Sequence, residues 1–166
     1  MRIVGCALVV AFLATTTLTV AGQVPVEYDS ATDFKQYRTY QWKTGTPARR
    51  PAAEDAIFNS VKRELTNRGL ARVDDGPGLY VVTHVLVDSH SLKQLDDAHY
   101  WEFVTGITSV DAYDLGSGTL VVDLIDVQRD KVVWRGVATG TVSGPLDKVI
   151  RRADKLIARM FRQLPR

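Results

Sequence analysis

The sequence contains almost no cysteine. Cys6 is the only one among 166 residues, and the segment before the motif Ile3–Cys6 is too short for this motif to be a lipid-attachment site. A later segment, Val20–Gly22, has the right position for such a site, but Gln23 follows it where a lipidated protein has cysteine. We therefore expect no lipid anchor unless the chain begins upstream of Met1. We also expect no disulfide or thiol chemistry beyond this N-terminal segment.

Acidic residues are absent from the first part of the chain. Arg2 is followed by an apolar run over residues 3–20 and then by the small residues of Val20–Gly22, a pattern typical of a secretory signal peptide. A membrane anchor is the alternative, but threonines dilute the run and it barely reaches the ~20 residues that a span needs. We expect residues 1–22 to be a signal peptide cleaved after Gly22. Residues 23–166 would then form one domain exported to the periplasm or cell envelope of a bacterium.

The chain also lacks an excess of charge of either sign. Its 21 lysines and arginines nearly balance 19 aspartates and glutamates, which gives a net charge of +2. No global field therefore attracts the protein to nucleic acid or to a membrane. Together with the predicted export, this disfavours nucleic acid as a partner, so any charged partner must meet a local patch.

Familiar catalytic arrangements are missing as well. We find no Ser/His/Asp order, no glycine-rich phosphate loop and no general acid–base pair, and we expect no cofactor. The best candidates for chemistry are His84, His90 and His99, which have aspartates nearby and could hold zinc in a metal-dependent hydrolase. Their spacing matches no known metal motif. We therefore favour a solvated loop and one structural histidine in a strand, and keep the hydrolase as the alternative.

The clearest structural pattern is a β-hairpin over residues 118–142. Two alternating strands flank a predicted turn at residues 128–130, and this register places Leu124 opposite Trp134 and Asp123 opposite Arg135. Asp123 and Arg135 could simply fix the register of the strands. Alternatively, the guanidinium of Arg135 could hold a carboxylate or phosphate of a ligand in a two-pronged grip.

The remaining elements complete a fold class. A helix is predicted from Pro51 to about Arg68, with Gly69 as its C-terminal cap, and a second helix over residues 146–163. Further strands are expected over residues 24–29, 38–42, 70–73, 79–88 and 101–113, with a basic loop at residues 43–50. Strands in a run followed by a helix indicate an α+β domain. We expect one mainly antiparallel sheet packed by two helices on one face.

Two features suggest binding rather than catalysis. The last predicted helix carries a basic stripe at helical spacing, composed of Lys148, Arg152, Lys155, Arg159 and Arg162. It could be an ordinary solvated face, or it could contact anionic lipid head groups, lipopolysaccharide phosphates or an acidic protein partner. A small-ligand carrier is a further alternative, with a pocket between sheet and helices lined by Tyr40, Trp42 and Trp134.

Two segments resemble a known family. VPVEYDSATDFKQYRTYQW and GTLVVDLIDVQRDKVVWRG are similar to the opening and to the hairpin of the DUF4136 family of bacterial envelope proteins. The likeness extends over the whole predicted domain, although Gln23 and Gly78 depart from residues common in the family. It implies an envelope location and an α+β fold, and no reaction. We therefore expect a non-catalytic exported envelope protein that binds a protein partner or an anionic envelope component.

Overall fold

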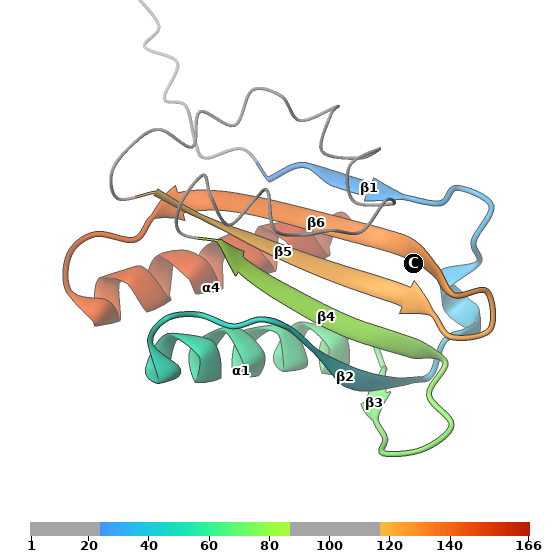
Figure 1. Cartoon of the computed structure of the whole chain (residues 1–166). Coiled ribbons are helices and arrows are strands. Elements are labelled where there is room, and N and C mark those ends of the chain that lie inside the picture. The colour runs from blue at the N-terminus through green and yellow to red at the C-terminus, as the bar shows by residue number, and fades with distance from the viewer. Residues whose placement is uncertain (1–23, 87–116) are drawn as a thin grey trace, which may run out of the picture.

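The computed structural model describes residues 24–86 and 117–166 (Figure 1). Within these ranges a six-stranded sheet has the order β1-β6-β5-β4-β2-β3. Its strands are β1 (Val26–Tyr28), β2 (Thr39–Thr46), β3 (Ala71–Arg72), β4 (Leu79–Leu86), β5 (Ser117–Asp126) and β6 (Lys131–Thr141). A 3₁₀ turn η1 (Phe34–Gln36) and two helices, α1 (Pro51–Asn67) and α4 (Leu146–Arg162), complete the described elements.

The predicted α+β class and the mainly antiparallel sheet are confirmed, although the sheet also contains two parallel strand pairs. Strands β4, β5, β6 and β1 pair antiparallel, whereas β2 is parallel to both β3 and β4. Helix α1 connects β2 to β3, and such a crossover returns the chain in the same direction. The parallel pairs therefore follow from the position of α1 in the sequence.

Strand β2 extends beyond its predicted end. The polar residues from Lys43 to Thr46 belong to the strand, so only residues 47–50 of the predicted basic loop lie outside secondary structure. Pairing with β4 explains the extension, because Thr46 lies opposite His84 and the Lys43 ammonium sits 4.3 Å from the centre of the Tyr80 ring. The strand predicted at residues 101–113 lies outside the described residues.

Helix α1 starts and ends as its local sequence signals indicate. Pro51 is its first residue, and Gly69 follows its end with a left-handed φ of +81°. The Gly69 amide donates to the Thr66 carbonyl at 2.9 Å, and the Leu70 amide donates to the Leu65 carbonyl at 3.1 Å. These two bonds form a Schellman cap that satisfies carbonyls at the helix end, so the predicted glycine cap is confirmed.

Both helices lie on one face of the sheet, side by side and parallel (Figure 1). Contacts between the two helices show that both run in the same direction. The Ser60 hydroxyl in the middle of α1 donates to Asp154 in the middle of α4 at 2.7 Å. Arg68, just after the end of α1, donates to the carbonyls of Phe161 and Leu164 at the end of α4. Arg68 thus binds carbonyls at and just beyond the C-terminus of α4, where the partial charge of the helix is negative.

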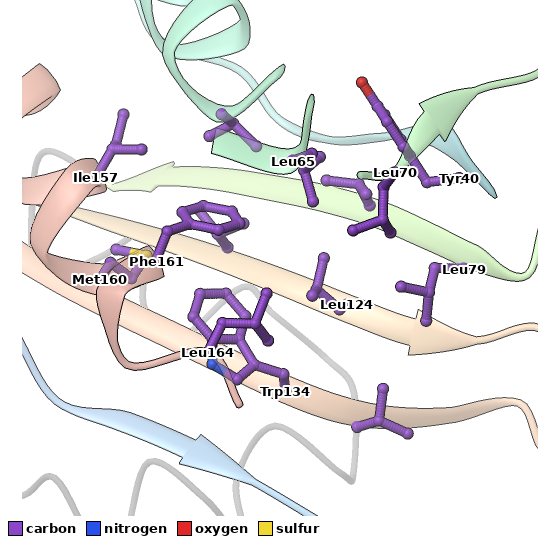
Figure 2. Packing of buried hydrophobic residues seen from close by; sticks show 14 of the residues in the cluster. Tyr40, Leu65, Leu70, Leu79, Leu124, Trp134, Ile157, Met160, Phe161 and Leu164 are labelled. Carbon is purple, nitrogen blue, oxygen red and sulfur yellow. The ribbon is translucent and has the colours of Figure 1, made fainter. Parts of the chain in front are cut away.

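The main core fills the space between sheet and helices, toward the C-terminal ends of the helices (Figure 2). Trp134 of β6 is fully buried, and the centre of its ring lies 5.1 Å from the centre of the Phe161 ring on α4. Gly136 lets Met160 approach the strand, because a Cβ at this position would overlap the Met160 side chain. Tight packing here fixes α4 against β6.

The β5–β6 hairpin has a longer turn than predicted, and a bulge in β6 restores the predicted register. Asp126 pairs with Lys131, so the turn has four residues, 127–130, rather than the three predicted. A bulge in β6 at Val133 takes up the difference, and beyond it Leu124 faces Trp134 and Asp123 faces Arg135 as predicted. The bulge also places Val133 in the core, beside Trp134, where regular alternation would direct it to the opposite face.

Among the described residues, neither helix combines the length and apolar character that crossing a membrane requires. The predicted signal peptide lies outside these residues and stays a prediction.

Candidate functional site

The basic stripe forms the outward face of α4. All five of its residues are exposed, while Ile157, Met160 and Phe161 bury the opposite side of the helix against the sheet. Six basic and two acidic residues give α4 a net charge of +4, which exceeds the +2 of the whole sequence. The positive charge of this protein is therefore concentrated on one helix.

The two acidic residues of α4 are engaged away from most of the stripe. Asp147 accepts a hydrogen bond from Arg151 at 2.6 Å, and Asp154 accepts from Ser60 and Arg63 of α1. Within residues 24–86 and 117–166, Lys148, Lys155, Arg159 and Arg162 form no ion pair. The stripe's polar side-chain contacts with the described part of the chain are two long hydrogen bonds from Arg152 to carbonyls just before the helix, those of Thr141 and Ser143. The stripe is thus a run of charges that an external anion could neutralise.

Asp123 and Arg135 meet on the opposite face of the sheet. The Arg135 Nε and Nη2 atoms donate to the two Asp123 carboxylate oxygens at 2.5 Å each, and both side chains are buried. Glu27 pairs with Arg135 across β1 and β6. Partial burial raises the pKa of the Glu27 carboxyl while the charge of Arg135 lowers it. The predicted pair therefore forms, and the guanidinium of Arg135 makes its bidentate contact with Asp123. Binding of a ligand by this pair stays a prediction.

Asp126 organises the tip of the hairpin. Its carboxylate accepts hydrogen bonds from the backbone amides of Gln128 and Arg129, and from the Tyr37 hydroxyl at 2.5 Å. Burial raises the pKa of the Asp126 carboxyl, but these bonds and the Arg129 guanidinium outweigh it and lower the pKa to about 2. The charged form is therefore the one that locks the turn to η1.

His84 lies in β4 with its ring at β2. The Thr46 amide donates to its Nδ1 at 3.2 Å, and the Thr46 hydroxyl lies 3.0 Å from the same atom. The residues that the structure describes hold no group of three or more side chains suited to a metal ion. His90 and His99 lie outside these residues, so the metal-dependent hydrolase stays a hypothesis that the structure does not test.

A cavity of about 330 Å³ lies between the two helices and the sheet. Its walls are mainly apolar and come from the first turns of α1 and α4 and from the ends of β4, β5 and β6 that lie nearest to them. Tyr40, Trp42 and Trp134 do not line it. Tyr40 and Trp134 are instead buried in the packed core, and Trp42 stacks on Phe58, so the predicted lining was wrong. Large aromatic residues fill space between layers rather than leave it open.

The cavity corresponds to a pattern of small residues in the sequence. Small residues occur on both helices and on the strands below, and their short side chains leave space between the layers. They are Ala53, Ala56, Ala153, Gly118 and Gly140. Alanine is an ordinary helix residue, so the pattern becomes informative only once the fold shows which alanines face each other.

The fold and its surfaces define a class of protein. This is a single α+β domain with two parallel helices on one face of a mixed sheet and a basic outer helix face. The family model DUF4136, a domain of unknown function, matches residues 24–166. The chain therefore belongs to the DUF4136 family, and the predicted resemblance is confirmed.

No curated protein matches the sequence. Among solved structures, a PDZ domain protein from Parabacteroides distasonis has a TM-score of 0.54 at 16% identity, over 87% of this chain and 36% of that one. This chain thus spans about a third of that protein, and the likeness concerns the fold alone. The PelC dodecamer from Paraburkholderia phytofirmans is more distant, with a TM-score of 0.49 at 18% identity over 84% of this chain and 96% of that one. A minor lipoprotein from Acinetobacter baumannii has a TM-score of 0.38 at 13% identity over 78% and 93%.

Proposed function

We propose that this DUF4136 protein is a non-catalytic protein of the bacterial envelope that binds an anionic envelope surface through the basic stripe of α4. The observation that carries the proposal is the outward placement of five cations, none of which forms an ion pair within the described residues. Near an anionic lipid surface each such lysine or arginine contributes about 1 kcal/mol. A stripe of five cations is therefore enough for reversible binding of the protein to an anionic lipid surface, without insertion of apolar side chains into the membrane.

The position of the helix favours this use. The apolar side of α4 is buried against the sheet, so the helix cannot lie in a membrane with that side inserted. The contact would instead be electrostatic. In the loop at residues 47–50, Arg49 and Arg50 line the same cavity as Arg152 and extend the basic surface toward the start of α1.

Binding to vesicles tests the proposal. The purified protein should bind vesicles that contain phosphatidylglycerol and not vesicles of phosphatidylcholine alone, with binding lost at high salt because exposed charges are screened. Neutralising two stripe residues, as Lys155→Gln with Arg159→Gln, should weaken binding roughly 30-fold at about 1 kcal/mol per charge. The matched control, Lys35→Gln with Lys62→Gln, removes the same charge elsewhere and should bind as the native protein does.

Other outcomes separate the alternatives. Equal loss of binding in both double variants would show a response to net charge rather than to the stripe. No binding to anionic vesicles, but capture of an acidic envelope protein that Lys155→Gln with Arg159→Gln abolishes, would replace the lipid surface by a protein partner. Export itself predicts a periplasmic product that begins at Gln23, which intact mass measures.

A further inference from the structure

The layer between the helices and the sheet is filled at one end and hollow at the other. At the C-terminal ends of the helices, Leu65, Trp134, Met160 and Phe161 pack without exposure to solvent (Figure 2). At the N-terminal ends, the cavity of about 330 Å³ occupies the corresponding place. The same two helices form both ends, and small side chains such as Ala53, Ala56 and Ala153 line the hollow one.

The hollow end is apolar inside and positively charged where it meets solvent. Its inner wall includes Ile57, Leu120, Ile150 and Leu156. The charged residues in its lining are all arginines, Arg49, Arg50 and Arg152, and all are exposed. Among the described residues that line it there is no aspartate or glutamate. An apolar interior with a cationic border is complementary to a molecule that has an apolar chain and an acidic head.

The parallel arrangement of the helices reinforces this charge. Both α1 and α4 begin beside the cavity, at Pro51 and Leu146. Among the described residues, neither N-cap side chain bonds to the first amides of its helix, although each first turn holds one carboxylate, Glu54 or Asp147. A helix N-terminus carries a partial positive charge. Two uncapped starts therefore add to the field of the arginines at the same end of the domain.

We propose that this cavity binds a single acyl chain with an acidic head group, the chain lying between α1, α4 and the sheet and the carboxylate or phosphate lying at Arg50 and Arg152. The volume is at the small end of the ~300–1,000 Å³ usual for ligand pockets, which suits one chain rather than the two of a phospholipid. This inference goes beyond the proposed surface attachment and does not depend on it.

Decanoate is the first probe, measured by titration calorimetry on the purified protein. Affinity should rise from octanoate to decanoate by about fourfold for each methylene that becomes buried, and should stop rising once the cavity is full. Decanol, which has the same chain and no charge, should bind at least tenfold more weakly, because a charge-assisted hydrogen bond contributes more than a neutral one. Decyl phosphate compared with decanoate distinguishes the two acidic heads.

Filling the cavity provides the matched variants. Ala153→Leu places extra carbon atoms in the cavity and should abolish decanoate binding, whereas Ala158→Leu adds the same atoms on α4 outside the lining and should not. Ala56→Leu fills the cavity from α1 and gives an independent result if the first variant unfolds. Arg50→Gln with Arg152→Gln should reduce decanoate affinity toward that of decanol and leave decanol binding unchanged.

The results separate this inference from the surface proposal. Lys155→Gln with Arg159→Gln should leave decanoate binding intact, while Ala153→Leu should leave vesicle binding intact. Absence of decanoate binding, or equal binding by the Ala153→Leu and Ala158→Leu variants, would overturn the cavity as a ligand site. Equal affinity for decanol and decanoate would overturn the assignment of an acidic head.

Discussion

Arg135 donates two hydrogen bonds of 2.5 Å to the carboxylate of Asp123 on the neighbouring strand, from β6 to β5. Both residues are almost fully buried, with 7% and 3% of their surface exposed. Such a pair stabilises a fold little relative to apolar residues of the same size, because both charges lose their hydration. Breaking it, however, leaves one buried charge without its partner, and this asymmetry makes the pair a sensitive point of the sheet.

We expect each single replacement of this pair to be strongly destabilising. Asp123→Leu and Arg135→Met should each lower the free energy of unfolding by about 3–5 kcal/mol, since the remaining charge stays buried. The double variant should lose clearly less than the sum of the two. Urea unfolding of the four proteins gives the coupling energy directly. Additive losses would show that the two side chains stabilise the sheet independently of each other.

Acidification should release the tip of the hairpin. The Asp126 pKa is about 2 in the folded protein and about 3.9 in an unfolded chain, so its contribution is present above the unfolded value and is lost as the pH falls through the folded one. We expect Asp126→Asn to be less stable than the native protein by roughly 2 kcal/mol near neutral pH. The difference should vanish toward about pH 2. Unfolding curves that keep a constant separation over this range would contradict the assignment.

Two glycines of β6 should respond differently to an added methyl group. Gly136→Ala directs the methyl into Met160 and Trp134 at the filled end of the layer, and overpacking of this kind costs about 1–3 kcal/mol. Gly140→Ala meets only the end of Leu156 at 3.1 Å, beside the cavity, and should change stability by less than about 1 kcal/mol. Thermal unfolding of the two variants compares the sites. Equal losses would show that the cavity end is as tightly packed as the core.

Elements with local signals were predictable from the sequence. Pro51 and Gly69 mark the ends of α1 through backbone geometry that neighbouring residues determine, and alternation along β5 and β6 places Asp123 opposite Arg135. The basic stripe follows from helical spacing alone. In each case the deciding interaction lies within a few residues or within one hairpin.

Features that depend on distant segments were not predictable in this way. The polar end of β2 has the composition of a loop and becomes a strand because β4 offers it hydrogen-bond partners. The cavity depends on which alanines of α1 and α4 face each other above Gly118 and Gly140, and only the assembled layers show this. Aromatic residues were a misleading guide to it, since they mark where the layers are full.

The bulge at Val133 makes the hairpin tolerant of changes in chain length. If the four-residue turn lost one residue, β6 could straighten at Val133 or the turn could tighten, and Asp123 would still face Arg135 in either case. A deletion of one residue at the tip is therefore absorbed before it reaches the charged pair and the core below it. The alignment of the sheet is thus protected from a shortening of its own hairpin tip.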